Sequence, residues 1–427
     1  MIDTEKDNSR AVERALLVGI QEPGAELSEA EEHLEELGEL TNTLGIPTID
    51  KIMVKLRRNS PKYLVGDGKA SEILDIVKEK NADCLVFDCE LSPSQQKNLT
   101  ELTKVCVIDR QEVIIDIFAS RASTKEAVLQ IDLARFQYML PRLTRAWTHL
   151  SRQRGGALGN KGEGEQQIEI DRRILKQKIS QLQKELADVK EQRKTQRKKR
   201  ERSGIPHAAI VGYTNAGKSS LLNALTGSGV FVEDKLFATL DPTTRKLLLP
   251  DSRELLLTDT VGFIRKLPHN LVEAFKSTLE EAVLADFLLI VVDLSSPFAE
   301  DYLQTTFSVL RELGAEDKES VVLFNKVDLG RDPVRVASLK PLVKEHVLIS
   351  VKTGEGLDKL LEILSRKVAV DSEIMRLRIP PERHDIAALL HHKAKVLDKT
   401  YDDDGFIIMT VNIKSSVKSM FAAFAKD

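Results

Sequence analysis

The chain has 427 residues, of which 42% are hydrophobic and 5% aromatic, and a formal net charge of −3 at pH 7. This length predicts two to four domains, and the hydrophobic content is sufficient for buried cores. The polar, acidic N-terminus argues against a secretory signal peptide, and the lack of a long apolar run argues against a membrane span. We therefore expect a soluble, cytoplasmic protein, and we expect it to be a monomer.

The three cysteines, Cys84, Cys89 and Cys106, are odd in number and show no paired spacing. This pattern argues against a disulfide framework or a zinc site. All three lie in or beside the apolar stretches 84–87 and 105–108, which are typical of strands, so we expect them to be small core residues of a protein in a reducing cytosol.

Residues 1–122 alternate between strand and helix patterns. Strands are predicted at 15–20, 49–56, 84–87 and 105–108, and helices at 28–44, 69–80 and 92–102, with Ser92 as an N-cap before Pro93. This order predicts a small, mostly parallel sheet covered by helices. Residues 63–69 resemble a phosphate-binding loop faintly but lack the full spacing, so an entry turn to a helix is the better interpretation.

Residues 123–203 have the pattern of a helical hairpin. A long helix is predicted over 124–150, which Pro141 should kink or split. A glycine-rich tip at 154–166 follows, and residues 154–164 should break all regular structure. In the next helix, apolar residues step four-three-four-three and predict a coiled-coil seam at Leu175, Ile179, Leu182, Leu186 and Val189.

A basic run ends this second helix. Such a run is usually a solvated helix face, but here it borders a projecting hairpin in a slightly acidic chain, which favours contact with a phosphate backbone. RNA is a more natural partner than DNA, although the residues alone do not decide it. The predicted RNA-contacting residues of this run are Arg193, Lys194, Arg197, Lys198, Lys199 and Arg200.

A glycine-rich loop with the pattern GxxxxGKS lies between a predicted strand and a predicted helix. Backbone N–H groups and the helix dipole at such a loop bind phosphate oxygens, while Lys218 reaches the β- and γ-phosphates and Ser219 can hold Mg²⁺. Glycine at positions 212 and 217 would allow the backbone to approach the nucleotide. The predicted phosphate-binding residues are Gly212, Tyr213, Thr214, Asn215, Ala216, Gly217, Lys218, Ser219, Ser220 and Gly262.

Later strand ends carry the other elements of a GTPase. Asp259 ends an apolar strand and can hold a Mg²⁺-bound water, and Thr239 is the favoured γ-phosphate-sensing Mg²⁺ ligand, with Thr243 and Thr244 as rivals. The predicted switch residues are Phe237, Ala238, Thr239, Leu240, Asp241, Asp259, Thr260, Val261 and Phe263. Guanine is expected to be bound by Asn325, Lys326, Asp328, Ser350, Val351 and Lys352.

Two residues suggest how hydrolysis is controlled. Phe263 stands where many GTPases have a Gln that orients the attacking water, so we expect slow intrinsic hydrolysis that a partner stimulates. Asn215 could help coordinate K⁺ beside the phosphates, but a simple turn role is equally compatible with the sequence.

The remaining chain predicts a small α+β module, with strands at 373–379 and 405–413 and helices at 381–397 and 416–424. The complete expectation is an α/β protein. It comprises an N-terminal α/β domain (1–122), a helical hairpin (123–203), a P-loop GTPase domain with a Ras-like doubly wound sheet (204–371) and a C-terminal module (372–427).

Over nearly its whole length, the chain resembles the HflX family of ribosome-associated GTPases. The resemblance is carried by residues 212–219, 236–243 and 259–264, and by a glycine-rich linker at 155–165 that is followed by Glu169 and residues 171–173. It implies binding to the large ribosomal subunit and its RNA, splitting of stalled ribosomes, also under heat stress, and hydrolysis stimulated by the ribosome. It adds the tip residues Gly155, Gly156, Gly159 and Lys161 to the expected RNA contacts. The family's N-terminal domain has also been linked to ATP binding, which nothing in these residues supports.

The hairpin tip departs from the family pattern, because residues 161–166 lack a proline and Glu163 adds a negative charge. This departure concerns the RNA contact more than the GTPase chemistry. Two other functions stay open: a GTPase for ribosome assembly or RNA modification, and a nucleotide-gated adaptor with little turnover.

Overall fold

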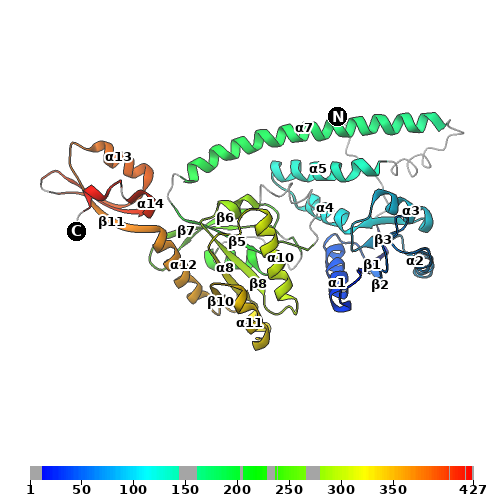
Figure 1. The fold of residues 1–427 in the computed structure, drawn as a ribbon. Helices are drawn as coiled ribbons and strands as arrows, with labels where there is room; N and C mark the ends of the chain where they lie inside the picture. The colour runs from blue at the N-terminus through cyan, green and yellow to red at the C-terminus, as the bar shows by residue number, and fades with distance from the viewer. Residues whose placement is uncertain are drawn as a thin grey trace. The chain divides into compact units, whose positions relative to one another are not determined.

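The computed structural model describes residues 12–143, 161–201, 205–227, 236–237, 239–265, 279–402, 404–418 and 420–425. Contacts group the chain into two compact units, and each is described by itself. The first consists mainly of residues up to Glu185, and the second mainly of residues from Leu186 onwards. Figure 1 labels their helices and strands. No described helix is long and apolar enough to cross a membrane.

A four-stranded parallel sheet forms the centre of the first unit. Its strands are β1 (Ala15–Gln21), β2 (Thr48–Lys55), β3 (Cys84–Phe87) and β4 (Cys106–Asp109), in the order β2-β1-β3-β4. The helices between them are α1 (Leu27–Thr43), α2 (Asp67–Lys80) and α3 (Pro93–Thr103). Side chains of α2 and α3 share one apolar core with β1 and β3. The predicted small parallel sheet with covering helices is therefore confirmed.

Local signals also hold in this unit, with one exception. Ser92 begins α3 with a capping box, because its hydroxyl accepts from the Gln95 N–H at 3.2 Å and its own N–H donates to Gln95 Oε1 at 3.0 Å. Cys84 is buried as expected, but Cys106 is exposed. Cys89 is partly buried and packs against the core. The expectation that the three cysteines are core residues was therefore wrong for Cys106, which begins the edge strand β4.

Helix α4 (Arg110–Arg121) follows β4 directly, in a stretch to which the sequence analysis assigned no element. The Asp109 carboxylate caps this helix by accepting from the Glu112 N–H at 3.0 Å. Its run of Val113, Ile114 and Ile115 is β-branched and almost continuously apolar, so it lacks the periodicity of an exposed amphipathic helix.

The two helices of the predicted hairpin are present in part. Helix α5 (Lys125–Met139) ends two residues before Pro141, and a 3-10 turn, η1 (Leu140–Arg142), follows, so the chain breaks its α-helix at the expected proline. Residues 144–150, predicted to continue the helix, lie outside the described residues.

Helix α7 (Lys161–Glu201) corrects the predicted extent of the glycine-rich break, because residues 161–164 are already helical. Each glycine costs about 1 kcal/mol in a helix, but propagation from a long run of good helix formers offsets this local cost. The predicted seam is confirmed: Leu182 and Leu186 are buried, while Leu175, Ile179 and Val189 are partly buried. The Lys178 ammonium lies 5.6 Å from the centroid of the Phe136 ring, which places α7 beside α5 within the first unit (Figure 1).

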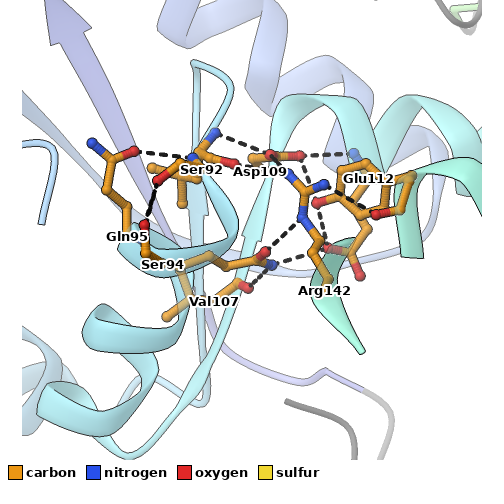
Figure 2. Close-up of polar contacts among 10 residues, drawn as sticks. Ser92, Ser94, Gln95, Val107, Asp109, Glu112 and Arg142 are labelled. Carbon is orange, nitrogen blue, oxygen red and sulfur yellow. Dashed lines mark hydrogen bonds and ion pairs between the residues drawn. The ribbon is translucent and has the colours of Figure 1, made fainter. Parts of the chain in front are cut away.

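A buried polar cluster joins α3, α4 and the end of α5 (Figure 2). The Tyr138 hydroxyl lies 3.0 Å from both Asp109 Oδ1 and Glu112 Oε2. The Arg142 guanidinium donates to Gln96 Oε1 at 3.0 Å and to the Leu91 carbonyl at 2.7 Å. Burial and, to a lesser extent, the nearby Asp109 carboxylate together raise the pKa of Glu112 to about 7.

The second unit contains a six-stranded sheet in the order β10-β9-β8-β5-β7-β6. Its strands are β5 (His207–Gly212), β6 (Thr243–Leu248), β7 (Glu254–Asp259), β8 (Phe287–Asp293), β9 (Ser320–Asn325) and β10 (His346–Leu348). All neighbouring strands are parallel except β6, which runs antiparallel to β7. The accompanying helices are α8 (Lys218–Thr226), α10 (Ala299–Glu312), α11 (Pro333–Leu339) and α12 (Leu357–Asp371). This is the predicted doubly wound α/β sheet.

A three-stranded antiparallel sheet follows in the same unit. Its strands β11 (Ser372–Ile379), β13 (Ile407–Lys414) and β12 (Lys395–Tyr401) lie in that spatial order, with α13 (His384–Lys393) and the short α14 (Ser415–Lys418) and η4 (Ala422–Phe424). The predicted helix over 381–397 was wrong at its end, since residues 395–401 form β12. Pairing with β13 satisfies backbone groups of this segment, so the tertiary partner overrides the local helical pattern.

The buried Glu112 predicts a pH-dependent stability of the first unit. Its pKa in the folded unit, about 7, lies above the reference value of 4.5, so folding favours the protonated form. Stability present below about pH 4.5 should be lost as the pH rises through 7, by an amount on the order of 1–3 kcal/mol. Urea unfolding of the full chain between about pH 5 and 8, with pulsed hydrogen exchange of α4 peptides as the readout, measures this loss.

Glu112→Gln should flatten this pH dependence, whereas the matched change at an exposed position, Glu90→Gln, should leave it unchanged. A pH dependence that persists undiminished in Glu112→Gln would assign the effect to other groups, of which Asp109 and Asp116 also have raised pKa values through burial.

Candidate functional site

The loop between β5 and α8 has the backbone of a phosphate-binding loop. Its glycines are required by their protein neighbours: a Cβ at Gly212 (φ +145°) would lie 2.2 Å from the Val291 carbonyl oxygen, and one at Gly217 (φ +99°) would lie 2.4 Å from Asn325 Nδ2. The sequence analysis explained these glycines by the close approach of a nucleotide. The structure adds a second reason, because residues at the ends of β8 and β9 also pack closely against them. Asn215 is exposed and has a left-handed φ of +58°, which suits a turn residue.

Three oxygen-bearing side chains from separate segments meet at the start of α8. Ser219 Oγ lies 2.7 Å from Thr239 Oγ1 and donates to Asp259 Oδ2 at 2.6 Å. Asp259 Oδ1 is buried and has no hydrogen-bond partner within the described part of the chain. An unpaired carboxylate oxygen beside two hydroxyls is a donor set suited to Mg²⁺.

The hydroxyls of the rival threonines have other hydrogen-bond partners. Thr243 and Thr244 are both in β6, where the Thr244 hydroxyl is 2.8 Å from that of Thr258. The Thr243 hydroxyl donates to the Asp241 carbonyl at 3.5 Å. Thr243 lies opposite Asp259 in the β6–β7 ladder, but of the three threonines it is the Thr239 hydroxyl that lies within hydrogen-bond distance of Ser219.

Lys218 is buried at the centre of the loop, and its ammonium donates to the Tyr213 carbonyl at 2.7 Å. Burial lowers the pKa of Lys218 to about 8, while Asp259 opposes this shift. Burial likewise raises the pKa of Asp259, against the effect of Lys218. Two buried, oppositely charged groups beside an anion-binding loop suit a ligand that carries phosphates and a cation.

The segment after β7 is joined to the phosphate loop through its backbone. The Phe263 N–H donates to the Gly212 carbonyl at 3.0 Å, and the Thr214 N–H donates to the Phe263 carbonyl at 2.8 Å. A Cβ at Gly262 would lie 2.7 Å from Thr214 Cα, so only glycine fits between them. The Phe263 ring is 1% exposed and serves the core. Thr260, Val261 and Leu240 are also buried, and the Thr260 hydroxyl donates to the Ile210 carbonyl.

The predicted guanine-binding residues gather at the ends of β9 and β10. The Asn325 amide donates to the Ala216 carbonyl at 2.8 Å and accepts from the Val351 N–H at 3.1 Å. The Ser350 hydroxyl donates to Asp328 Oδ1 at 2.7 Å, while Asp328 stays exposed. A fixed, exposed carboxylate can accept the two N–H groups on one edge of guanine.

The other predicted residues are placed as follows. Lys352 is exposed and Ser220 is partly buried. Phe237 is buried with a φ of +56°; it groups with the first unit, where its ring lies edge-on to Phe118 at 4.5 Å. Ala238 and the tip residues Gly155, Gly156 and Gly159 lie outside the described residues. Lys161 and the basic run from Arg193 to Arg200 lie within helix α7.

Sequence reasoning missed Asp293, which forms an ion pair with Lys326 at 2.6 Å. The signal was present, because Asp293 ends the apolar strand β8 as Asp259 ends β7. It also missed Tyr302 of α10, whose ring stacks on that of Tyr213. No local signal pointed to Tyr302, which lies in an ordinary amphipathic helix.

Three family models match the chain. They are described as GTP-binding GTPase N-terminal (residues 31–119), GTP-binding GTPase Middle Region (residues 121–200) and 50S ribosome-binding GTPase (residues 207–326). The last spans the phosphate loop, Asp259 and Asn325. Fold, site and match together define a P-loop GTPase, an enzyme that binds and hydrolyses GTP.

Among curated proteins, the GTPase HflX of Akkermansia muciniphila is 50% identical over 418 residues, which are 95% of each chain. That of Escherichia coli (strain K12) is 39% identical over 383 residues, 90% of each chain. This chain therefore belongs to the HflX family of GTPases. A solved GTP-binding protein of Sulfolobus solfataricus, in complex with GDP, is 26% identical, covering 84% of this chain and 99% of that one, with a TM-score of 0.45.

The predicted guanine-binding residues imply that one substitution should change the nucleotide specificity. Asp328→Asn should weaken GTP binding by about 1–3 kcal/mol, because the guanine N–H groups lose their acceptor. The same variant should gain affinity for xanthosine triphosphate, whose edge offers the complementary pattern. Equilibrium titration with fluorescent analogues of both nucleotides measures the two affinities.

Ser350→Ala is the matched control, because it removes the hydroxyl that orients Asp328 but keeps the carboxylate. It should lower the affinity for GTP less than Asp328→Asn does, and it should not raise the affinity for xanthosine triphosphate. Unchanged GTP affinity in Asp328→Asn would refute the assignment of the base site.

Proposed function

We propose that this HflX-family GTPase acts in the cytoplasm, binds the large ribosomal subunit, and uses its GTP cycle to split or rescue stalled ribosomes. One observation carries the proposal: the model described as a 50S ribosome-binding GTPase matches residues 207–326. That stretch contains Ser219, Asp259 and Asn325, so the segment that matches the family model also contains the polar residues of the proposed nucleotide site.

Within this site, the loop residues 212–220 and Gly262 are proposed to bind the phosphates. Ser219 and Thr239 would ligate Mg²⁺ directly, and Asp259 would do so through a water molecule, since its Oδ1 is unpaired in the described part of the chain. Asn325, Asp328 and the loop 350–352 would bind guanine. Mg²⁺ would neutralise charge on the phosphates during hydrolysis.

The intrinsic rate is proposed to be low. Phe263 stands at the position where a water-orienting side chain could act, but its ring is buried and has no polar atom. The chain itself, in its described part, therefore offers no obvious group at that position, which favours completion of the site by a partner.

The hairpin is proposed to provide the RNA contact. Along α7, six basic residues lie within eight positions, Arg193 to Arg200, in a chain whose net charge is −3. Such a density of positive charge favours a phosphate backbone as partner, through release of counterions. The proposal includes four domains: an N-terminal α/β domain (1–122), the helical hairpin (123–203), the GTPase domain (204–371) and a C-terminal module (372–427).

Hydrolysis with and without ribosomal particles tests the function. Isolated large subunits or whole ribosomes should raise the hydrolysis rate by about tenfold or more, since a partner that completes a GTPase site can supply far larger effects. Isolated small subunits should not. Phosphate release under multiple turnover measures the rates, and sucrose-gradient sedimentation of whole ribosomes measures splitting.

Lys218→Ala, which removes the buried phosphate-binding ammonium, should abolish both stimulation and splitting. A variant with the six basic residues replaced by Gln should bind ribosomes more weakly and with a flatter salt dependence, while GTP affinity stays unchanged. Stimulation without splitting would favour a role in ribosome assembly or RNA modification. No stimulation by any particle would contradict the proposal and favour a nucleotide-gated adaptor.

Asn215 is proposed to help hold K⁺ beside the phosphates, because its side chain is exposed at the edge of the loop. Hydrolysis should then be faster in K⁺ than in Na⁺ at equal ionic strength, and Asn215→Ala should remove the difference. Steady-state rates in the two salts measure it. Equal rates for the unmodified protein would leave Asn215 with the turn role that its left-handed backbone already supports.

A further inference from the structure

The side chain of Tyr213 has no role in the phosphate site described above. Only its carbonyl takes part there, as the acceptor for Lys218. Its side chain is nevertheless buried, with 4% of the residue exposed, and it contacts two segments other than the phosphate loop. A large aromatic side chain in the second position of a phosphate loop therefore requires an explanation of its own.

The first contact is with α10. The rings of Tyr213 and Tyr302 are stacked, with centroids 4.0 Å apart and planes 10° from parallel. Tyr302 lies in the first turn of a long amphipathic helix whose apolar residues, such as Leu303, are buried. The stack thus fixes the plane of the Tyr213 phenol relative to a rigid element.

The second contact is with the segment after Gly262. The Tyr213 hydroxyl accepts a hydrogen bond from the Arg265 N–H at 3.1 Å. Arg265 is partly buried, and its guanidinium lies 5.7 Å from the centroid of the Tyr302 ring. All three residues belong to the second unit, so the contact is internal to it.

These contacts extend a backbone connection that already exists. Gly212 and Thr214 bond to the backbone of Phe263, and the Tyr213 hydroxyl reaches two residues further along the same segment. The phosphate loop therefore holds the chain from Phe263 to Arg265 at two points, one through backbone and one through a phenol. Only the second can be removed by a side-chain substitution.

We propose that Tyr213 is a positioning residue for hydrolysis: its hydroxyl, oriented by the stack on Tyr302, fixes the segment that follows Gly262 relative to the phosphate loop. This deepens the GTPase activity of the family and rests on the proposed assignment of residues 212–219 to the phosphates. Because this segment directly follows Gly262, whose N–H we propose to contact the γ-phosphate, its position bears on the transition state more than on the bound nucleotide.

Tyr213→Phe tests the proposal, since it removes the hydroxyl and keeps the ring. The Arg265 N–H then loses its acceptor, and the segment loses its second anchor. We expect kcat for GTP hydrolysis by the full-length protein to fall about fivefold to tenfold, with KM and the dissociation constant for GDP changed less than about twofold. Single-turnover hydrolysis and displacement of a fluorescent GDP analogue measure these quantities.

Three further variants separate positioning from a general loss of structure. Tyr302→Ala removes the stack and should reproduce the loss in kcat, whereas Tyr302→Phe keeps the ring and should restore most of it. The double variant Tyr213→Phe/Tyr302→Ala should be no slower than the slower single variant, because both act through one contact. Tyr401→Phe, at an exposed tyrosine of β12, is the matched control for the loss of a phenol.

Wild-type kcat in Tyr213→Phe would overturn the proposal, as would strictly additive losses in the double variant. Parallel losses of kcat and GDP affinity in Tyr213→Phe would also overturn it, because they would show that Tyr213 shapes the ground-state phosphate loop. Failure of the site assignment itself is distinguishable, because Lys218→Ala would then retain nucleotide binding.

Discussion

The side-chain amide of Asn325 connects the two halves of the nucleotide site. It donates to the carbonyl of Ala216 in the phosphate loop and accepts from the N–H of Val351 in the guanine loop, while its Nδ2 leaves room for no side chain at position 217. Because Asn325 ends β9, two strands from β5 in the sheet, this one amide links the predicted phosphate loop to the predicted guanine loop. A parallel sheet brings all its carboxyl ends to one edge, and the site depends on that geometry.

Electrostatics explain why this edge is suited to a charged ligand. Lys218 and Asp259 are both buried, and burial opposes the charged form of each, lowering the first pKa and raising the second. Phosphate oxygens and a divalent cation would supply the missing counter-charges. The Asp259 carboxylate keeps one oxygen, Oδ1, without a hydrogen-bond partner in the described part of the chain. That oxygen would therefore be free to interact with a Mg²⁺-bound water.

The first unit uses buried charge differently. Arg110 pairs there with Glu36 and Asp88, and the separate cluster of Asp109, Glu112, Tyr138 and Arg142 joins the end of α5 to the ends of β3 and β4. These groups pair with one another through charged hydrogen bonds, which hold helices α1, α4 and α5 on the sheet. The charged residues named here in the first unit pair with one another, whereas those of the second unit lie at the predicted phosphate-binding loop.

The sequence alone predicted the parallel sheet of the first unit, the helix cap at Ser92 and the positions of the GTPase motifs, because each depends on local spacing: apolar periodicity, glycine position and the residue that ends a strand. It could not determine which of Thr239, Thr243 and Thr244 meets Ser219, since all three are equally polar. In the structure Thr243 and Thr244 pair with Asp259 and Thr258 along the β6–β7 ladder, and their hydroxyls bond to Asp241 and Thr258, whereas Thr239 lies outside the strand and its hydroxyl reaches Ser219. It likewise missed α4 and β12, where buried packing and pairing with β13 override local patterns. The contact of Tyr213 with Tyr302 and Arg265 was also decided only in three dimensions. These residues lie 89 and 52 positions away in the sequence, and they meet because α10 packs on β5 and β8 and because the chain after β7 runs beside the end of β5.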